Sequence, residues 1–118
     1  MSESQAKQEL EILLHNHKDH FIFADIHKLL SICYWKMGNI EQAFMEGAIA
    51  LAIRITYAPT DYTQISLQYY RLALIFVVIN KWKEAEEFLI QAIVTARLSM
   101  DLSQTYIQEL EANLVNLR

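Results

Sequence analysis

The chain has very little of the material from which tight turns are made. Its 118 residues include only two glycines and one proline. β-Sandwiches and barrels need many short turns, and Gly and Pro are prominent among the residues that form them. The shortage therefore excludes such folds and predicts an all-α protein. A length of 118 residues predicts one domain.

Cysteine and long apolar runs are also scarce. Cys33 is the single cysteine and lies in an apolar stretch, so we expect a small buried core residue rather than a reactive thiol. The longest apolar run, 72–79, is less than half of the roughly 20 residues that a membrane span needs. The start of the chain is polar and lacks the apolar stretch of a signal peptide. We expect a cytoplasmic protein without membrane insertion.

The signals for nucleic-acid binding and for catalysis are missing. The formal net charge is −4, and the ten Lys and Arg residues are scattered, whereas phosphate binding requires clustered positive charge. There is no His-Glu-x-x-His motif, no Gly-rich phosphate loop and no nucleophile elbow. The sequence therefore predicts no enzyme, no cofactor and no nucleic-acid partner.

One histidine cluster resembles a metal site. His15, His17 and His20 lie close together, and imidazoles bind zinc or nickel. Their spacing crosses an expected helix end and turn, so convergence on one ion is not implied. We interpret the cluster as a polar loop and predict no metal site.

Two stretches of the chain are imperfect copies of each other. The matching pairs are Leu30 and Leu72, Tyr34 and Phe76, Ala43 and Ala85, and Ala50 and Ala92. The offset is the same in every pair, and we call the offset from Ala43 to Ala85 one repeat period. A period of about 40 residues is typical of stacked helical repeats. Such arrays usually bind proteins.

The paired residues resemble the tetratricopeptide repeat family over residues 24 to 100. In that family a first helix carries Leu next to a small residue and then an aromatic, and a second helix carries two alanines. The resemblance implies a solenoid of antiparallel helix hairpins, with Trp82 packed inside its hairpin. Three features depart from the pattern: His27 and Gly47 replace usual aromatics, and no proline closes either copy.

We expect six helices in this α-α superhelix. The first repeat spans 18–57 and the second 60–100, with flanking helices at 3–16 and 101–118. Gly38 is the expected end of one helix, Asn39 the cap of the next, and Asp101 the cap of the last. The run 72–79 has strand propensity, but the repeat alignment places it on a helix.

The resemblance also implies a concave groove lined by the first helix of each hairpin. The positions that we expect to bind a partner are Lys28, Ile32, Trp35, Leu67, Tyr70, Arg71, Leu74 and Val78. They are mostly apolar with a charged rim, so the expected ligand is a hydrophobic or amphipathic segment of a protein. Ile32 and Leu74 stand where the family's carboxylate-gripping members would use Asn, so a receptor for chain ends is disfavoured.

The resemblance leaves the role open between two classes. Similar proteins include adaptors and bacterial secretion chaperones. The alternative is a structural subunit whose apolar faces are consumed by permanent homo- or hetero-oligomeric assembly. A hydrophobic fraction of 53% is high for a small helical domain and favours a surface that meets a partner in either case.

Overall fold

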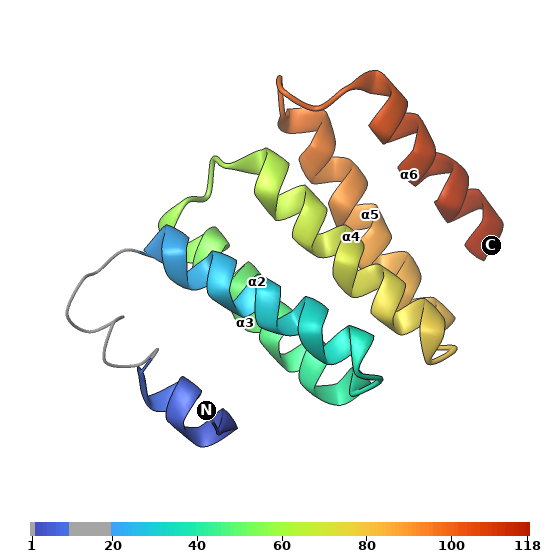
Figure 1. The fold of residues 1–118 in the computed structure, drawn as a ribbon. Coiled ribbons are helices and arrows are strands. Elements are labelled where there is room, and N and C mark those ends of the chain that lie inside the picture. The colour runs from blue at the N-terminus through green and yellow to red at the C-terminus, as the bar shows by residue number, and fades with distance from the viewer. Residues whose placement is uncertain (1, 10–19) are drawn as a thin grey trace.

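The computed structural model describes residues 2–9 and 20–118, and their regular structure is helical (Figure 1). Residues 3–9 are helical, followed by α2 (His20–Lys36), α3 (Ile40–Tyr57), α4 (Tyr62–Val78), α5 (Trp82–Leu98) and α6 (Gln104–Leu117). α2 packs against α3 and α4 against α5, which gives two antiparallel hairpins. α3 contacts α4 and α5 contacts α6, so the hairpins stack in chain order. The all-α hairpin architecture is confirmed.

The repeat period of the sequence is also the period of the structure. Shifted by one repeat period, the bounds of α2 coincide with those of α4. The same shift carries Tyr62, the first residue of α4, to Gln104, the first residue of α6. α6 therefore occupies the position of a third first helix. The apolar run 72–79 lies in α4 up to Val78, as the repeat alignment predicts.

Both hairpin turns have the same geometry. Gly38 has φ 81° and Asn80 has φ 61°, and these two positions are one repeat period apart. The amide of the following residue, Asn39 or Lys81, donates to the carbonyl of Tyr34 or Phe76 at 2.9 Å. This bond is the six-to-one link of a Schellman motif, which requires a left-handed residue. The predicted helix end at Gly38 is confirmed.

Because only the backbone conformation restricts Gly38, its replacement should act through strain alone. An added Cβ at Gly38 meets no heavy atom within 4 Å. We expect Gly38→Val to lower the free energy of unfolding by about 1–2 kcal/mol, measured by urea denaturation. Asn80→Gly should instead be neutral or slightly stabilising, because glycine adopts positive φ freely. Equal effects of the two substitutions would contradict this account of the turns.

Small residues allow the helices of each hairpin to approach closely. Ala43, Ala50, Ala85 and Ala92 are all 0% exposed. Ser31 Oγ donates to the Ala43 carbonyl at 2.6 Å, and Ser66 Oγ donates to the Ala92 carbonyl at 2.7 Å. Each bond links a first helix to the backbone of a second one. The alanines that define the repeat are therefore contact points between paired helices.

Gly47 explains one departure from the family pattern. A Cβ at this position would lie 2.9 Å from Leu72 Cδ2 and 3.1 Å from both Gln68 Nε2 and Ser31 Oγ. Gln68 Nε2 donates to the Gly47 carbonyl at 3.2 Å. α4 approaches α3 so closely here that an aromatic side chain has no room. The absence of a side chain at Gly47 thus allows the two hairpins to contact each other at this point.

Of the two helix caps predicted from the sequence, one is confirmed and the other is wrong. Asn39 accepts a bond from the Gln42 amide, as expected. Asp101 does not cap the last helix, because Ser103 occupies that position and accepts a bond from the Tyr106 amide. α6 buries Ile107 and Leu110 against the core. The expected helix at 3–16 extends beyond the described residues.

Two expectations about burial are wrong. Trp82 is 49% exposed because it is the first residue of α5, at the tip of the hairpin. Cys33 is exposed as well, although Ile75, its counterpart one repeat period later, is 4% exposed. Ile75 packs in the core cluster that α3 and α4 share, whereas α2 has no preceding described hairpin to cover it.

Candidate functional site

The eight predicted partner-binding residues lie on two helices that face the same side. Lys28, Ile32 and Trp35 come from α2, and Leu67, Tyr70, Arg71, Leu74 and Val78 come from α4. All eight are partly or largely exposed. In Figure 1, α2 and α4 lie in front of α3 and α5. We name this surface the α2–α4 face.

A continuous stripe runs along α4. Leu67, Arg71, Leu74 and Val78 are spaced by four, three and four residues, which places them on one side of a helix. Leu74 is 41% exposed and Val78 is 53% exposed. The stripe is therefore apolar and accessible, with one cation between its leucines.

Sequence reasoning missed one residue of this face. Leu29 on α2 is 55% exposed and lies one repeat period before Arg71, so it occupies the equivalent place in its repeat. Shifting the α4 stripe back by one period would have identified it. The same shift makes Ile32 the equivalent of Leu74.

Tyr70 and Trp35 have a structural role that the sequence did not indicate. The Tyr70 hydroxyl accepts a bond from Asn113 Nδ2 of α6 at 3.0 Å, and its ring lies 6.3 Å from that of Tyr106. Trp35 packs against the core cluster that contains Ala43 and Leu72. These two aromatics hold helices together as well as lining the face.

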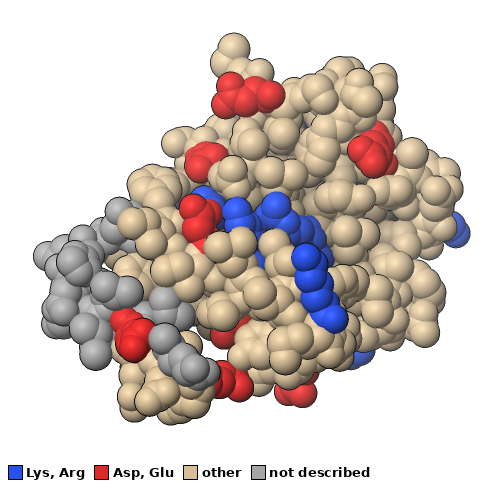
Figure 2. Space-filling model, in the orientation of Figure 1, with Lys and Arg blue, Asp and Glu red and all other residues tan. Residues whose placement is uncertain are grey.

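Positive charge gathers on the α2–α4 face although the whole chain is acidic. Figure 2 shows Lys and Arg atoms as one band across α2 and α4. Arg54 reaches this region from α3 and is only 4% exposed, paired with Asp25 and, at 3.9 Å, with Asp61. Lys28 lies 3.6 Å from the same Asp25 carboxylate. The Asp25 carboxylate is thus shared between Arg54 and Lys28.

Arg71 is a partly buried cation of this face whose charge no described carboxylate balances. It is partly buried and donates to Gln68 Oε1 at 3.4 Å, but it makes no ion pair with any described residue. Burial lowers the pKa of the Arg71 guanidinium, the nearby Tyr106 opposes that shift, and the positive charge of Arg54 adds to it. Arg71 carries a positive charge, because an arginine guanidinium is not deprotonated in proteins.

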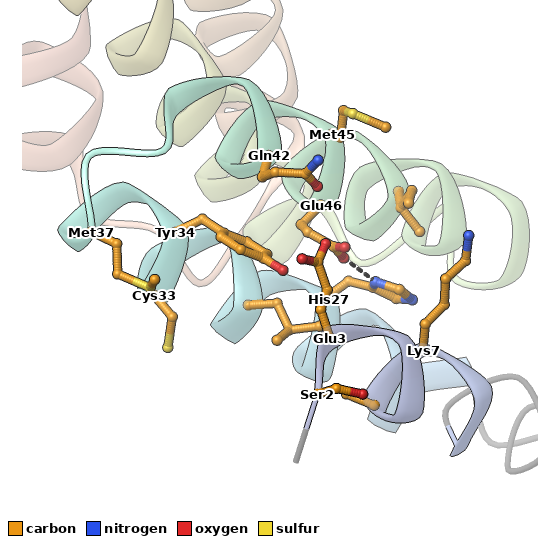
Figure 3. Close-up of a pocket in the computed structure, with 13 residues that line it drawn as sticks. Ser2, Glu3, Lys7, His27, Cys33, Tyr34, Met37, Gln42, Met45 and Glu46 are labelled. Atoms are coloured by element: carbon orange, nitrogen blue, oxygen red, sulfur yellow. Dashed lines mark hydrogen bonds and ion pairs between the residues drawn. The ribbon is translucent and has the colours of Figure 1, made fainter.

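A separate cavity of about 690 Å³ opens on the other side of α2, between residues 2–7 and the first hairpin (Figure 3). Its apolar wall consists of Leu30, Cys33, Met37, Met45 and Ile49. A hydrogen bond between His27 Nδ1 and Glu46 Oε2 lies at its side. None of the eight predicted residues lines this cavity.

The cavity marks a packing surface that is only partly used. Leu72, the counterpart of Leu30 one period later, is 1% exposed because α4 packs on α3. The corresponding position before α2 is taken by polar residues such as Ser2, Glu3 and Lys7. An open space therefore remains beside α2 in the first hairpin, whereas α3 covers the equivalent side of α4 in the second hairpin.

The structure describes only part of the histidine cluster that resembles a metal site. His15 and His17 lie outside the described residues. His20 stacks on Tyr57 with ring centroids 3.4 Å apart, which gives it a packing role. Within residues 2–9 and 20–118, no group of three or more His, Cys, Asp and Glu is placed to hold a metal ion.

Comparisons with known proteins do not assign the chain to a family. No family model matches the sequence, and no curated protein matches it. Among the helices of the described part of the chain, none is long and apolar enough to cross a membrane.

Proposed function

We propose that this protein is a protein-binding module, an adaptor or a chaperone, that holds a hydrophobic or amphipathic segment of its partner on the α2–α4 face. The observation that carries the proposal is the stripe along α4. Leu74 and Val78 are large apolar residues, yet both are exposed there. By contrast, the apolar residues of α4 that pack against neighbouring helices are buried. Exposed apolar residues in a row favour an interaction surface.

The resemblance to tetratricopeptide repeats supports the same proposal. The two hairpins are related by one repeat period, and the repeat-defining alanines lie at their internal contacts. Arrays of this kind present an extended face for proteins. We propose a cytoplasmic location, because the single cysteine cannot form an internal disulfide and the fold therefore requires no oxidising compartment.

A structural subunit is the second candidate, and one observation on α6 favours it. Val115 is 71% exposed, whereas Ala73, its counterpart one period earlier, is 2% exposed and packs in the core cluster formed with α5 residues. α6 thus presents an apolar position that a further helix would cover. Permanent assembly would bury such positions.

Sedimentation velocity separates the two candidates. We expect the purified chain to be a monomer at micromolar concentration, because each core cluster is built from residues of one chain. Selection from a library of random peptides should then yield ligands. A stable oligomer whose contacts include α6 or the α2–α4 face, together with failure to select any peptide, would replace the proposal with the structural subunit.

A further inference from the structure

Arg71 differs from the other arginines of the chain. The sequence contains four arginines, and three of them have a carboxylate partner: Arg54 with Asp25, Arg97 with Glu111 and Arg118 with Glu86. Among the described residues, Arg71 has only an amide oxygen, that of Gln68. It is also less exposed than Arg97 or Arg118. A partly buried cation without an anion has lost water without gaining an opposite charge.

The surroundings of Arg71 set the kind of anion that fits. A guanidinium group matches the planar geometry of a carboxylate through paired N–H donors. Leu67 and Leu74 flank Arg71 on the same side of α4. A ligand whose carboxylate pairs with Arg71 would therefore meet apolar side chains of α4 on both sides of that carboxylate. This arrangement suits a side-chain carboxylate within a segment better than the carboxylate at the end of a chain.

Charge complementarity favours an acidic segment on this face. The chain carries a net charge of −4, so an acidic ligand is not attracted by the charge of the molecule as a whole. The band of Lys and Arg atoms in Figure 2 is where such a ligand is attracted. Complementary charge of this kind selects partners and fixes their register.

We propose that the segment bound by the α2–α4 face carries an aspartate or glutamate between apolar side chains, and that its carboxylate pairs with Arg71. This inference rests on the proposed function, because it names the chemistry of the partner at the same surface. Arg71 is the residue that gives specificity, and Leu67 and Leu74 supply the apolar contacts on either side.

Peptide selection provides the test. Random peptides of about four helical turns are displayed in two libraries, one with both peptide ends joined to the carrier and one with a free carboxyl end. The wild-type chain, Arg71→Gln and Arg71→Lys are each used for selection. Arg97→Gln is the matched control, because Arg97 is an exposed arginine of α5 that pairs with α6. Circular dichroism and melting confirm that each variant is folded.

We expect the wild-type chain to enrich, from the library with joined ends, peptides in which Asp or Glu stands between apolar residues. Arg71→Gln should bind these peptides about 10-fold or more weakly, the loss expected for a charged hydrogen bond. Replacing the peptide acid by its amide should weaken binding to the wild type and not to Arg71→Gln. Arg71→Lys should keep the acidic preference, and Arg97→Gln should behave as the wild type.

Four results would overturn the inference. Selected peptides without acidic enrichment, or unchanged binding by Arg71→Gln, would refute the role of Arg71 and leave the proposed function in place. Acidic preference seen only with free carboxyl ends would assign the site to chain termini. Absence of ligands from both libraries would refute the proposed function itself.

Discussion

Leucine in place of Ala43 or Ala85 is expected to lower the free energy of unfolding by about 1–3 kcal/mol, the usual effect of overpacking a close contact. Both alanines are 0% exposed and lie where paired helices meet. Ser31 Oγ bonds to the Ala43 carbonyl at 2.6 Å, so the helices have no space for a larger side chain at this point. Urea denaturation at neutral pH measures the change.

Ala52→Leu is the matched control for the first of these substitutions. Ala52 lies on α3, the same helix as Ala43, but it is exposed. Leucine is nearly as good a helix former as alanine, so this variant should unfold like the parent. If Ala43→Leu and Ala85→Leu also unfold like the parent, the close contacts of the hairpins are described wrongly.

Leu74→Lys is expected to weaken binding of the peptides selected by the wild-type chain strongly, while the melting temperature stays close to that of the parent. An anchor residue at the centre of an interface commonly contributes about 2 kcal/mol or more, which corresponds to a loss of roughly 30-fold. The folded state should tolerate the change because Leu74 is 41% exposed and belongs to neither core cluster. Isothermal titration calorimetry with one selected peptide measures the effect.

Val94→Lys tests whether any new surface lysine would act in the same way. Val94 lies on α5 and is 49% exposed, a value near that of Leu74, but it lies beside α6 rather than on the α2–α4 face. This variant should bind the peptide normally. Full binding by Leu74→Lys would move the interaction to another surface, the cavity beside α2 being the next to examine.

Tyr70 is unsuitable for the same test, although the sequence placed it beside Leu74 on the face. Its hydroxyl bonds to Asn113 and its ring meets Tyr106, so a glutamate at this position would disturb the contact between α4 and α6. Loss of binding in Tyr70→Glu could not be separated from loss of structure. The helical spacing alone could not reveal this contact, because it depends on where α6 lies.

The candidate face was predictable in outline for a simple reason. Residues three and four apart on a helix share one side, so the period and the helix bounds together identify Leu67, Arg71 and Leu74 as one stripe. The same rule would have added Leu29. It could not supply the pairing of Arg54 with Asp25, or show that no described acid pairs with Arg71, since both depend on side chains from different helices.

The sequence by itself determined the helical class, the repeat period and the turns at Gly38 and Asn80. These features follow from local preferences: few breakers, small residues at fixed spacing, and residues that accept positive φ. Only the tertiary structure decided which sides of the helices are covered. Cys33 and Trp82 are exposed, and Arg71 has no anion among the described residues, because burial depends on where neighbouring helices begin and end.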